Sequence, residues 1–258
     1  MSLSISYDSS FDGFLSVVFE IYRQHLDVGE IRPDRSTAPC NLFMQPFRVE
    51  TSAESAQRLR RAIVNQASAD ILELLRVVLC SEEDGVEMKI LAYLRKVFDG
   101  KDPHYAKNPT SDEMLPLYMI ARAVRREEGG MLGMLRFDRT ADGTYFAEIE
   151  PKYNILGMMV GHFRGRFANE RWAIYDSKRG FGVYYNGQDP SQGPVEITIP
   201  NMQQVKAATP KDDFVKLWQD YYKSIAIKER ENPRLLRSCL PVRYWNHLPE
   251  RQIAPSWT

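Results

Sequence analysis

The sequence predicts an α+β protein in which packed helices cover an antiparallel sheet. Short aromatic and β-branched runs with turn signals between them follow residue 129, as expected of strands. Residues 52–128 instead repeat apolar side chains with the period of amphipathic helices. Hydrophobic residues make up 43% of the 258 residues, which is enough for a sizeable core. We therefore expect a sheet domain built from residues 1–50 and 129–258, with a helical subdomain, residues 51–128, inserted near the N-terminus.

The first fifty residues indicate a strand, a helix and a connecting segment. Leu3 to Tyr7 alternates like a short strand, and Ser9 with Asp12 supplies a helix start signal. Residues 27–47 hold three prolines and no sustained period, which predicts a connection without regular structure. One face of the predicted helix carries its apolar residues, Phe14, Val17, Val18, Ile21 and Tyr22.

Four helices are expected next, at about residues 52–66, 69–81, 85–98 and 111–128. Thr51 and Glu54 form a capping box before the first of them. Apolar residues recur at helical spacing in the second and third, so these helices should pack together. Those residues are Ile71, Leu74, Leu75, Val78, Ile90, Leu91, Leu94, Val97 and Phe98.

The remaining chain predicts the order ββαβββ. Gly129-Gly130 should end the helical region, and the runs MLGMLRF and TYFAEIE should form a hairpin around Asp142-Gly143. A helix of about residues 154–167, a second hairpin at 171–187 and a strand at 195–199 follow. Short hairpins favour antiparallel pairing, so one helix could cover the sheet. Further helices should begin at Thr209-Pro210 and Asn232-Pro233.

Composition and missing motifs exclude several classes of protein. The 34 basic and 34 acidic residues balance, so the whole molecule should not attract nucleic acid. No apolar run approaches the roughly 20 residues of a membrane span, and the N-terminus does not resemble a secretory signal. Three widely spaced cysteines, Cys40, Cys80 and Cys239, favour a reducing cytoplasm. Metal-site spacings, a Walker loop and GxGxxG are all missing, so we expect neither a metal nor a cofactor.

Positive charge is nevertheless concentrated in two segments. Residues 164–179 contain five cations and two anions, and residues 228–251 contain six cations and three anions. Arginine and lysine could bind phosphate while aromatic rings stack on bases. A solvated surface, with aromatic rings packed in the core, is the alternative. The candidate nucleic-acid-binding residues are Arg164, Arg166, Lys178, Arg179, Arg230, Arg234, Arg237, Arg243, Tyr244 and Trp245.

The candidates for catalysis are His162, Asp176 and Arg179. His162 could be a general base or a phosphate contact, although a histidine without a partner nearby in sequence is usually structural. Asp176 could orient Arg179 beside the tip of the hairpin or bind a metal, and orientation is the simpler interpretation. Glu148 and Glu150, two apart on one strand, share a sheet face and could form a paired-carboxylate site; solvation at a sheet edge is the alternative.

Three segments together resemble one bacterial family of DNA-metabolism proteins. They are SYDSSFDGFLSVVFEIY, FAEIEPKYNILGMMVGHFRGRFANERWAIYDSKRGFGVYY and YYKSIAIKERENPRLLRSCLPVRYW. This family is encoded beside a DNA-modification or repair radical SAM protein, and its members often carry a uracil-DNA glycosylase-type domain. The resemblance implies a radical SAM protein as partner and places any glycosylase activity in a separate protein.

Three functions stay open at this point. The first is an accessory protein of DNA metabolism that contacts single-stranded or damaged DNA through the basic hairpin and tail. The second is a DNA-processing enzyme with a site around His162, Asp176 and Arg179. The third is a subunit that binds only the radical SAM protein.

Overall fold

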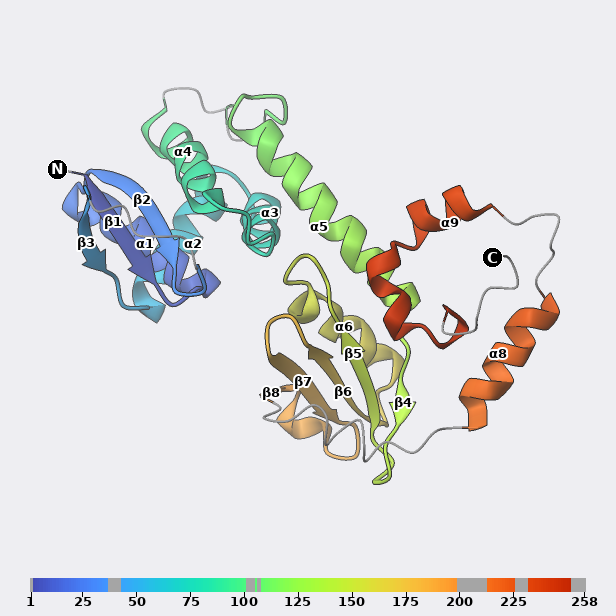
Figure 1. Ribbon diagram of the computed structural model, residues 1–258. Helices are drawn as coiled ribbons and strands as arrows, with labels where there is room; N and C mark the ends of the chain where they lie inside the picture. The colour runs from blue at the N-terminus through green and yellow to red at the C-terminus, as the bar shows by residue number, and fades with distance from the viewer. Residues whose placement is uncertain are drawn as a thin grey trace. The chain divides into compact units, whose positions relative to one another are not determined.

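The computed structural model describes residues 2–36, 43–100, 105, 108–198, 213–225 and 232–251. It is an α+β protein, as the sequence predicts (Figure 1). The chain divides into two compact units, Met1–Arg125 and Arg126–Thr258. This division differs from the expected one, which joined residues 1–50 to the C-terminal sheet. The difference arises because the N-terminal strands pair with one another and form a sheet of their own.

The N-terminal sheet contains three parallel strands. β1 (Leu3–Tyr7) lies between β2 (Val28–Pro33) and β3 (Gln45–Arg48). The prediction of an irregular connection over residues 27–47 was therefore wrong, since both outer strands lie in it. Short strands of a parallel sheet show little alternation of apolar and polar residues. Pro33 at the end of β2 and Pro46 within the edge strand β3 lie where they disturb the pairing least.

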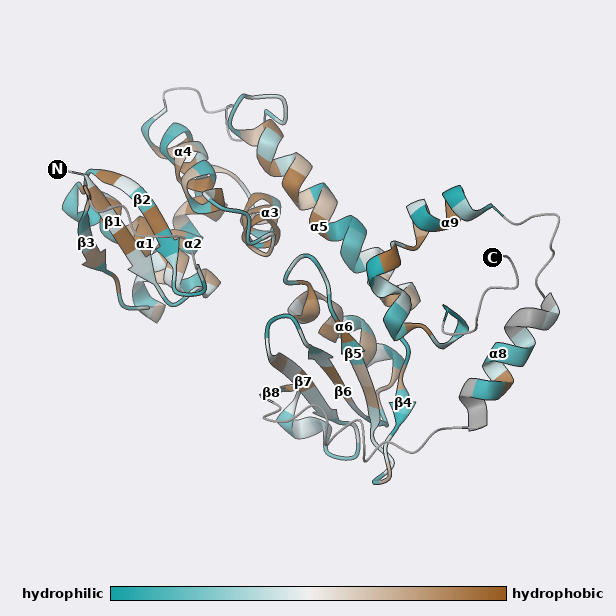
Figure 2. Ribbon diagram, in the orientation of Figure 1, coloured by the Kyte–Doolittle hydropathy of each residue, from teal (hydrophilic) through white to brown (hydrophobic). Residues whose placement is uncertain are grey.

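Helices complete the N-terminal unit. α1 (Phe11–Gln24) begins at Ser10, whose side chain accepts a hydrogen bond from the Gly13 backbone, and α1 packs against α2 (Ala53–Gln66). α3 (Ala69–Leu79) and α4 (Val86–Asp99) follow as the apolar period predicts. Hydrophobic stretches lie in β2, α3 and α4, with hydrophilic loops between them (Figure 2).

α5 (Met114–Met134) crosses the boundary between the units and runs beyond its predicted end. Gly129-Gly130 does not stop the helix, and residues 131–134, expected in a strand, are helical. Each glycine costs only about 1 kcal/mol in a helix. Burial of Met131 in the C-terminal unit, at 3% exposure, offsets such a cost.

The C-terminal unit holds a five-stranded mixed sheet in the order β4-β5-β6-β7-β8. The expectation of purely antiparallel pairing was wrong, because β5 and β6 run parallel. The helix α6 (Leu156–Arg166) connects them, and a helical crossover is what parallel neighbours require. The strands are β4 (Asp138–Arg139), β5 (Tyr145–Ile149), β6 (Arg171–Asp176), β7 (Phe181–Asn186) and β8 (Val195–Ile197).

α6 packs on one face of this sheet, where Phe163 contacts the fully buried Trp172 of β6. The opposite face carries a second apolar cluster of Phe146, Ala173 and Tyr175. The hairpin of β6 and β7 closes over Ser177–Gly180, where Gly180 has a φ of +74° that favours glycine.

Further helical segments complete the described part of the C-terminal unit. η2 (Pro190–Gln192) precedes β8, and α9 (Pro233–Cys239) starts with Asn232 as its N-cap, as predicted. The tail continues with η4 (Val242–His247) and η5 (Pro249–Arg251), and η4 packs against β5. The helix α8 (Asp213–Ile225) contacts η5, while its predicted start at Thr209-Pro210 lies outside the described residues.

Candidate nucleic-acid interface

The basic hairpin tip is organised around a buried carboxylate. Asp176 has a side-chain exposure of 0%, and its Oδ1 accepts hydrogen bonds from the backbone N–H groups of Lys178 and Arg179, both over 3.1 Å. Its Oδ2 accepts from Arg179 Nη1 over 2.8 Å. Burial raises the pKa of the Asp176 carboxyl above its ordinary value, and the Arg179 guanidinium opposes that effect. Arg179 therefore neutralises a buried charge.

The hairpin tip also holds the chain segment that follows β5. Arg179 donates to the carbonyl of Pro151 over 3.2 Å and to that of Lys152 over 2.9 Å. Lys178 Nζ donates to the same Lys152 carbonyl over 2.9 Å. With a side-chain exposure of 9%, Arg179 has its donors directed inward and is a structural residue more than a surface cation.

Glu127 holds this segment from its other side. Its carboxylate accepts from the backbone N–H of Lys152 over 3.0 Å and from that of Tyr153 over 2.8 Å. Arg243 Nη2 donates to Glu127 over 3.1 Å, and the Tyr244 hydroxyl also donates to it. The hairpin tip and the C-terminal tail, far apart in sequence, thus meet at residues 151–153.

The aromatic residues of the tail are anchored inside the unit. Tyr244 is 3% exposed, and burial together with Glu127 raises the pKa of its phenol to about 12. The Trp245 indole donates to the Leu240 carbonyl over 3.0 Å. The structure therefore places both rings as packing residues, the alternative that the sequence left open.

The other predicted binding residues fall into two groups. Arg230 lies outside the described residues. The remaining five are Arg164 and Arg166 at the end of α6, Lys178 on the hairpin tip, and Arg234 and Arg237 on α9. All five are exposed, and within the part of the chain that the structure describes none of them forms an ion pair with a carboxylate. Their charges are therefore available to an outside anion.

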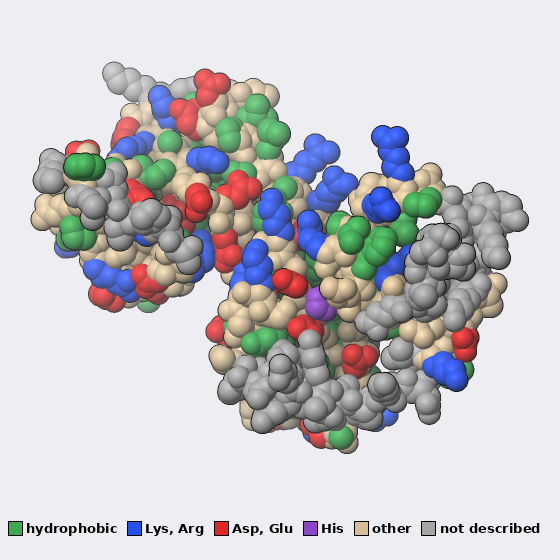
Figure 3. Space-filling model, viewed as in Figure 1, with side chains coloured by type: hydrophobic (Ala, Val, Ile, Leu, Met, Phe, Trp, Pro, Cys, Tyr) green, Lys and Arg blue, Asp and Glu red, His purple; other side chains and the backbone are tan. Residues whose placement is uncertain are grey.

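The face drawn in Figure 3 does not show one continuous positive field. On the face drawn in Figure 3, lysine and arginine side chains are interspersed with aspartate and glutamate. A phosphate-binding role must therefore rest on the individual cations that lack a neighbouring carboxylate. The formal net charge of zero gives it no support.

The three catalytic candidates differ in their accessibility. His162 is exposed on α6, where its ring meets Phe163 edge-on. Asp176 is inaccessible and is occupied by Arg179 and two backbone donors. Within the described residues, no hydrogen bond joins His162 to Asp176 or Arg179.

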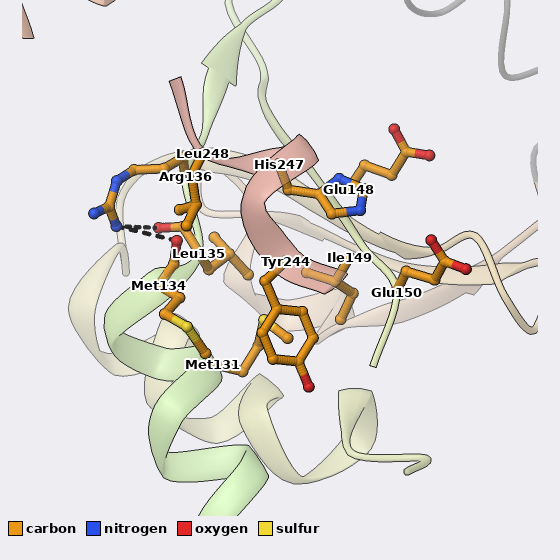
Figure 4. A pocket seen from close by; sticks show the side chains of 10 residues that line it. All are labelled: Met131, Met134, Leu135, Arg136, Glu148, Ile149, Glu150, Tyr244, His247 and Leu248. Carbon is orange, nitrogen blue, oxygen red and sulfur yellow. Dashed lines mark hydrogen bonds between the residues drawn. The ribbon is translucent and has the colours of Figure 1, made fainter. Parts of the chain in front are cut away.

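A small hollow lies at the end of β5 and was not predicted from the sequence. Glu148, Glu150 and His247 lie on one side of it, and Met131, Met134 and Leu135 on the other (Figure 4). Arg136, Ile149, Tyr244 and Leu248 complete its lining. The spacing of the two glutamates predicts a shared sheet face, but His247 comes from the tail, and no local motif connects it to them.

The described residues offer neither a metal cluster nor a membrane span. They contain no group of three or more histidine, cysteine, aspartate or glutamate side chains that could hold a metal ion. None of their helices is long and apolar enough to cross a membrane.

Comparison with known proteins shows the family. A domain of unknown function, DUF4130, matches residues 84–250. The chain belongs to the DUF4130 family. No curated protein matches. Among solved structures, the DHH domain of a protein described as a member of a family of ribosomal proteins covers 74% of this chain and 75% of its own, at 12% identity and a TM-score of 0.31. A likeness this low carries no argument.

Proposed function

We propose that this DUF4130 protein is an accessory protein of DNA metabolism or repair that contacts the phosphates of single-stranded or damaged DNA. One observation carries the proposal: five of the ten cations and aromatic residues expected to bind nucleic acid are exposed cations without an ion-pair partner among the described residues. Neutralising phosphates with such cations releases counterions and drives binding. The contact residues are Arg164, Arg166, Lys178, Arg234 and Arg237.

The proposed function requires no reaction by this chain. The alternative of an enzyme with His162, Asp176 and Arg179 in its site loses support, because a catalytic carboxylate must reach its substrate. Asp176 is fully buried and already paired. The radical SAM protein that the family resemblance implies is retained as the partner that supplies chemistry. The proposal takes the cytoplasm as the compartment in which the two proteins work.

The experiment is a salt titration of binding to a fluorescently labelled single-stranded oligonucleotide, followed by anisotropy. Replacing Arg164 and Arg166 by glutamine should weaken binding and reduce its salt dependence. The slope of log K against log salt should fall in magnitude by about 0.7 for each phosphate that is no longer neutralised. The matching change of Arg234 and Arg237 should act in the same way, because both pairs lie on exposed helix surfaces.

A matched control removes two positive charges from the N-terminal unit. Arg61→Gln with Lys89→Gln changes exposed residues of α2 and α4, so net charge falls equally while the proposed contacts stay intact. This control should leave the slope unchanged. The proposal is overturned if the protein does not bind at low salt, or if replacing all five contact cations leaves affinity and slope as they were.

A further inference from the structure

The helix α5 buries one face and leaves apolar side chains exposed on the opposite one. Leu117 and Val124 are fully buried, whereas Leu115 is 49% exposed, Tyr118 38% and Met119 66%. Single exposed apolar side chains are common on protein surfaces, but these three lie together within five residues of one helix. Figure 2 shows the hydropathy of α5 falling from its first turns toward its middle. The first turns of α5 therefore present an apolar surface to the outside.

A charge of opposite sign lies at each end of this surface. Asp112 and Arg122 are exposed, and neither forms an ion pair within the part of the chain that the structure describes. The Leu115 backbone N–H donates to the Ser111 carbonyl over 2.9 Å, so the first turn of the helix already includes Asp112. All of these residues belong to the unit Met1–Arg125. One helix thus fixes both charges and leaves them accessible to a partner.

The spacing of these residues makes the surface complementary to itself. Asp112, Leu115, Met119 and Arg122 follow one another at intervals of three, four and three residues. This is the spacing of a coiled-coil seam, in which every position faces a second helix. Turning a copy of the helix end to end reverses the order of the residues and keeps the intervals. Asp112 then faces Arg122 of the second copy, and Leu115 faces Met119 of the second copy.

The charges select this antiparallel orientation. A parallel pair would place Asp112 opposite Asp112 and Arg122 opposite Arg122, and like charges repel each other. In the antiparallel pair an acid meets a base at either end, and apolar side chains meet in the two layers between them. A two-fold interface uses the same patch on both subunits and therefore requires such self-complementarity. A different protein would require no such symmetry, so the surface fits a second copy of this chain.

We propose that α5 is a dimer interface, in which Asp112, Leu115, Tyr118, Met119 and Arg122 pack antiparallel on the same residues of a second copy. Tyr118 lies beside the seam and widens the apolar contact. Residues 112–122 span about 16 Å of helix. A contact of this length falls below the roughly 1,200 Å² that stable interfaces bury, so we expect association to be weak and dependent on concentration.

The test is sedimentation equilibrium of the full chain over a concentration series that reaches about 1 mM. A reducing agent is present because Cys239 is exposed and could form a disulfide between copies. The unchanged protein should move from monomer toward dimer mass as its concentration rises. Asp112→Arg and Arg122→Asp each place like charges in both end layers, so each variant alone should associate at least about ten-fold more weakly.

Mixing the two charge variants tests which residues face each other. One variant carries only arginine at positions 112 and 122 and the other only aspartate, so both end layers of a mixed pair are complementary. The mixture should recover the association of the unchanged protein, and so should a single chain with both changes. Asp70→Arg and Arg61→Asp are the matched controls at exposed residues of α3 and α2. They should associate like the unchanged protein, alone and mixed.

The inference is overturned if the protein stays monomeric at every concentration. Association that neither charge variant weakens also overturns it, as does a mixture that recovers nothing. Circular dichroism of each variant checks that the helices are retained, so that weaker association reports on the surface of α5. No DNA is present in this experiment, and the dimer and the proposed DNA contacts can therefore fail independently of each other.

Discussion

Replacing Arg179 by methionine should destabilise the C-terminal unit strongly. The change removes the only side-chain cation within ion-pair distance of Asp176 among the described residues, while Asp176 stays at 0% exposure. Breaking a buried ion pair by removing one partner typically costs about 3 to 5 kcal/mol, because the remaining charge is buried without compensation. The carbonyls of Pro151 and Lys152 also lose donors. We therefore expect a loss in unfolding free energy toward the upper half of that range.

The assay is urea unfolding followed by tryptophan fluorescence. All four tryptophans of the chain lie in the unit Arg126–Thr258, so the signal reports that unit alone. Arg164→Met is the matched control, since Arg164 is exposed and forms no ion pair with a described residue. Its change in unfolding free energy should stay within about 0.5 kcal/mol.

A double-mutant cycle tests the physical cause. Asp176→Asn combined with Arg179→Met removes both charges, so the double variant should cost clearly less than the sum of the two single changes. The coupling should reach about 1 to 3 kcal/mol. The reasoning is refuted if Arg179→Met costs less than about 1 kcal/mol, or if the two changes are additive. Either result would show that the ion pair of Arg179 with Asp176 does not stabilise the unit as argued.

Two further predictions concern buried ionisable groups and pH. Burial raises the pKa of Glu87, which accepts a hydrogen bond from Tyr7, above its ordinary value of 4.5. The protonated carboxyl therefore stabilises the fold fully below about pH 4.5, and this contribution is lost as pH rises through the pKa of Glu87 in the folded protein. Above pH 4.5, the free energy of unfolding, measured by urea unfolding with circular dichroism, should depend less on pH in Glu87→Gln than in the unchanged protein. The same pH dependence in both proteins would contradict this. Tyr244, with its pKa near 12, should lose stability between about pH 10 and 12. Tyr244→Phe should remove that loss of stability at high pH. At pH 8 it should lower the free energy of unfolding by about 1.5 to 3 kcal/mol, because the hydrogen bond to Glu127 is lost. A decrease near zero in fluorescence-monitored unfolding would contradict this prediction.

The helices of the N-terminal unit could be predicted because their signals are local. The apolar face of α3 repeats at helical spacing, and the capping box predicted at Thr51 lies one residue before the observed N-cap of α2, Ser52. The parallel strands β2 and β3 could not be predicted in the same way. Their pairing partner, β1, precedes them by more than twenty residues, and a parallel partner leaves no turn signature in the sequence.

The candidate site shows a similar division between local and distant information. The sequence locates every arginine but does not say which of them a carboxylate neutralises. Arg179 meets Asp176 three residues away, in the orienting contact that the sequence predicts. Arg243 meets Glu127, which lies 116 residues before it, and no periodicity connects them. His247 approaches the hollow of Glu148 and Glu150 for the same reason, through packing of η4 on β5.

The segment at residues 151–153 links the stability of the unit to the proposed phosphate contact at Lys178. Glu127 holds its N–H groups and Arg179 its carbonyls, so changing either residue should also displace Lys178, which donates to the Lys152 carbonyl. Loss of DNA binding in a Glu127 or Arg179 variant would therefore not identify a contact residue. Arg164 and Arg166 make none of these bonds to the segment, so changes at these two positions test phosphate binding without removing a bond that holds it.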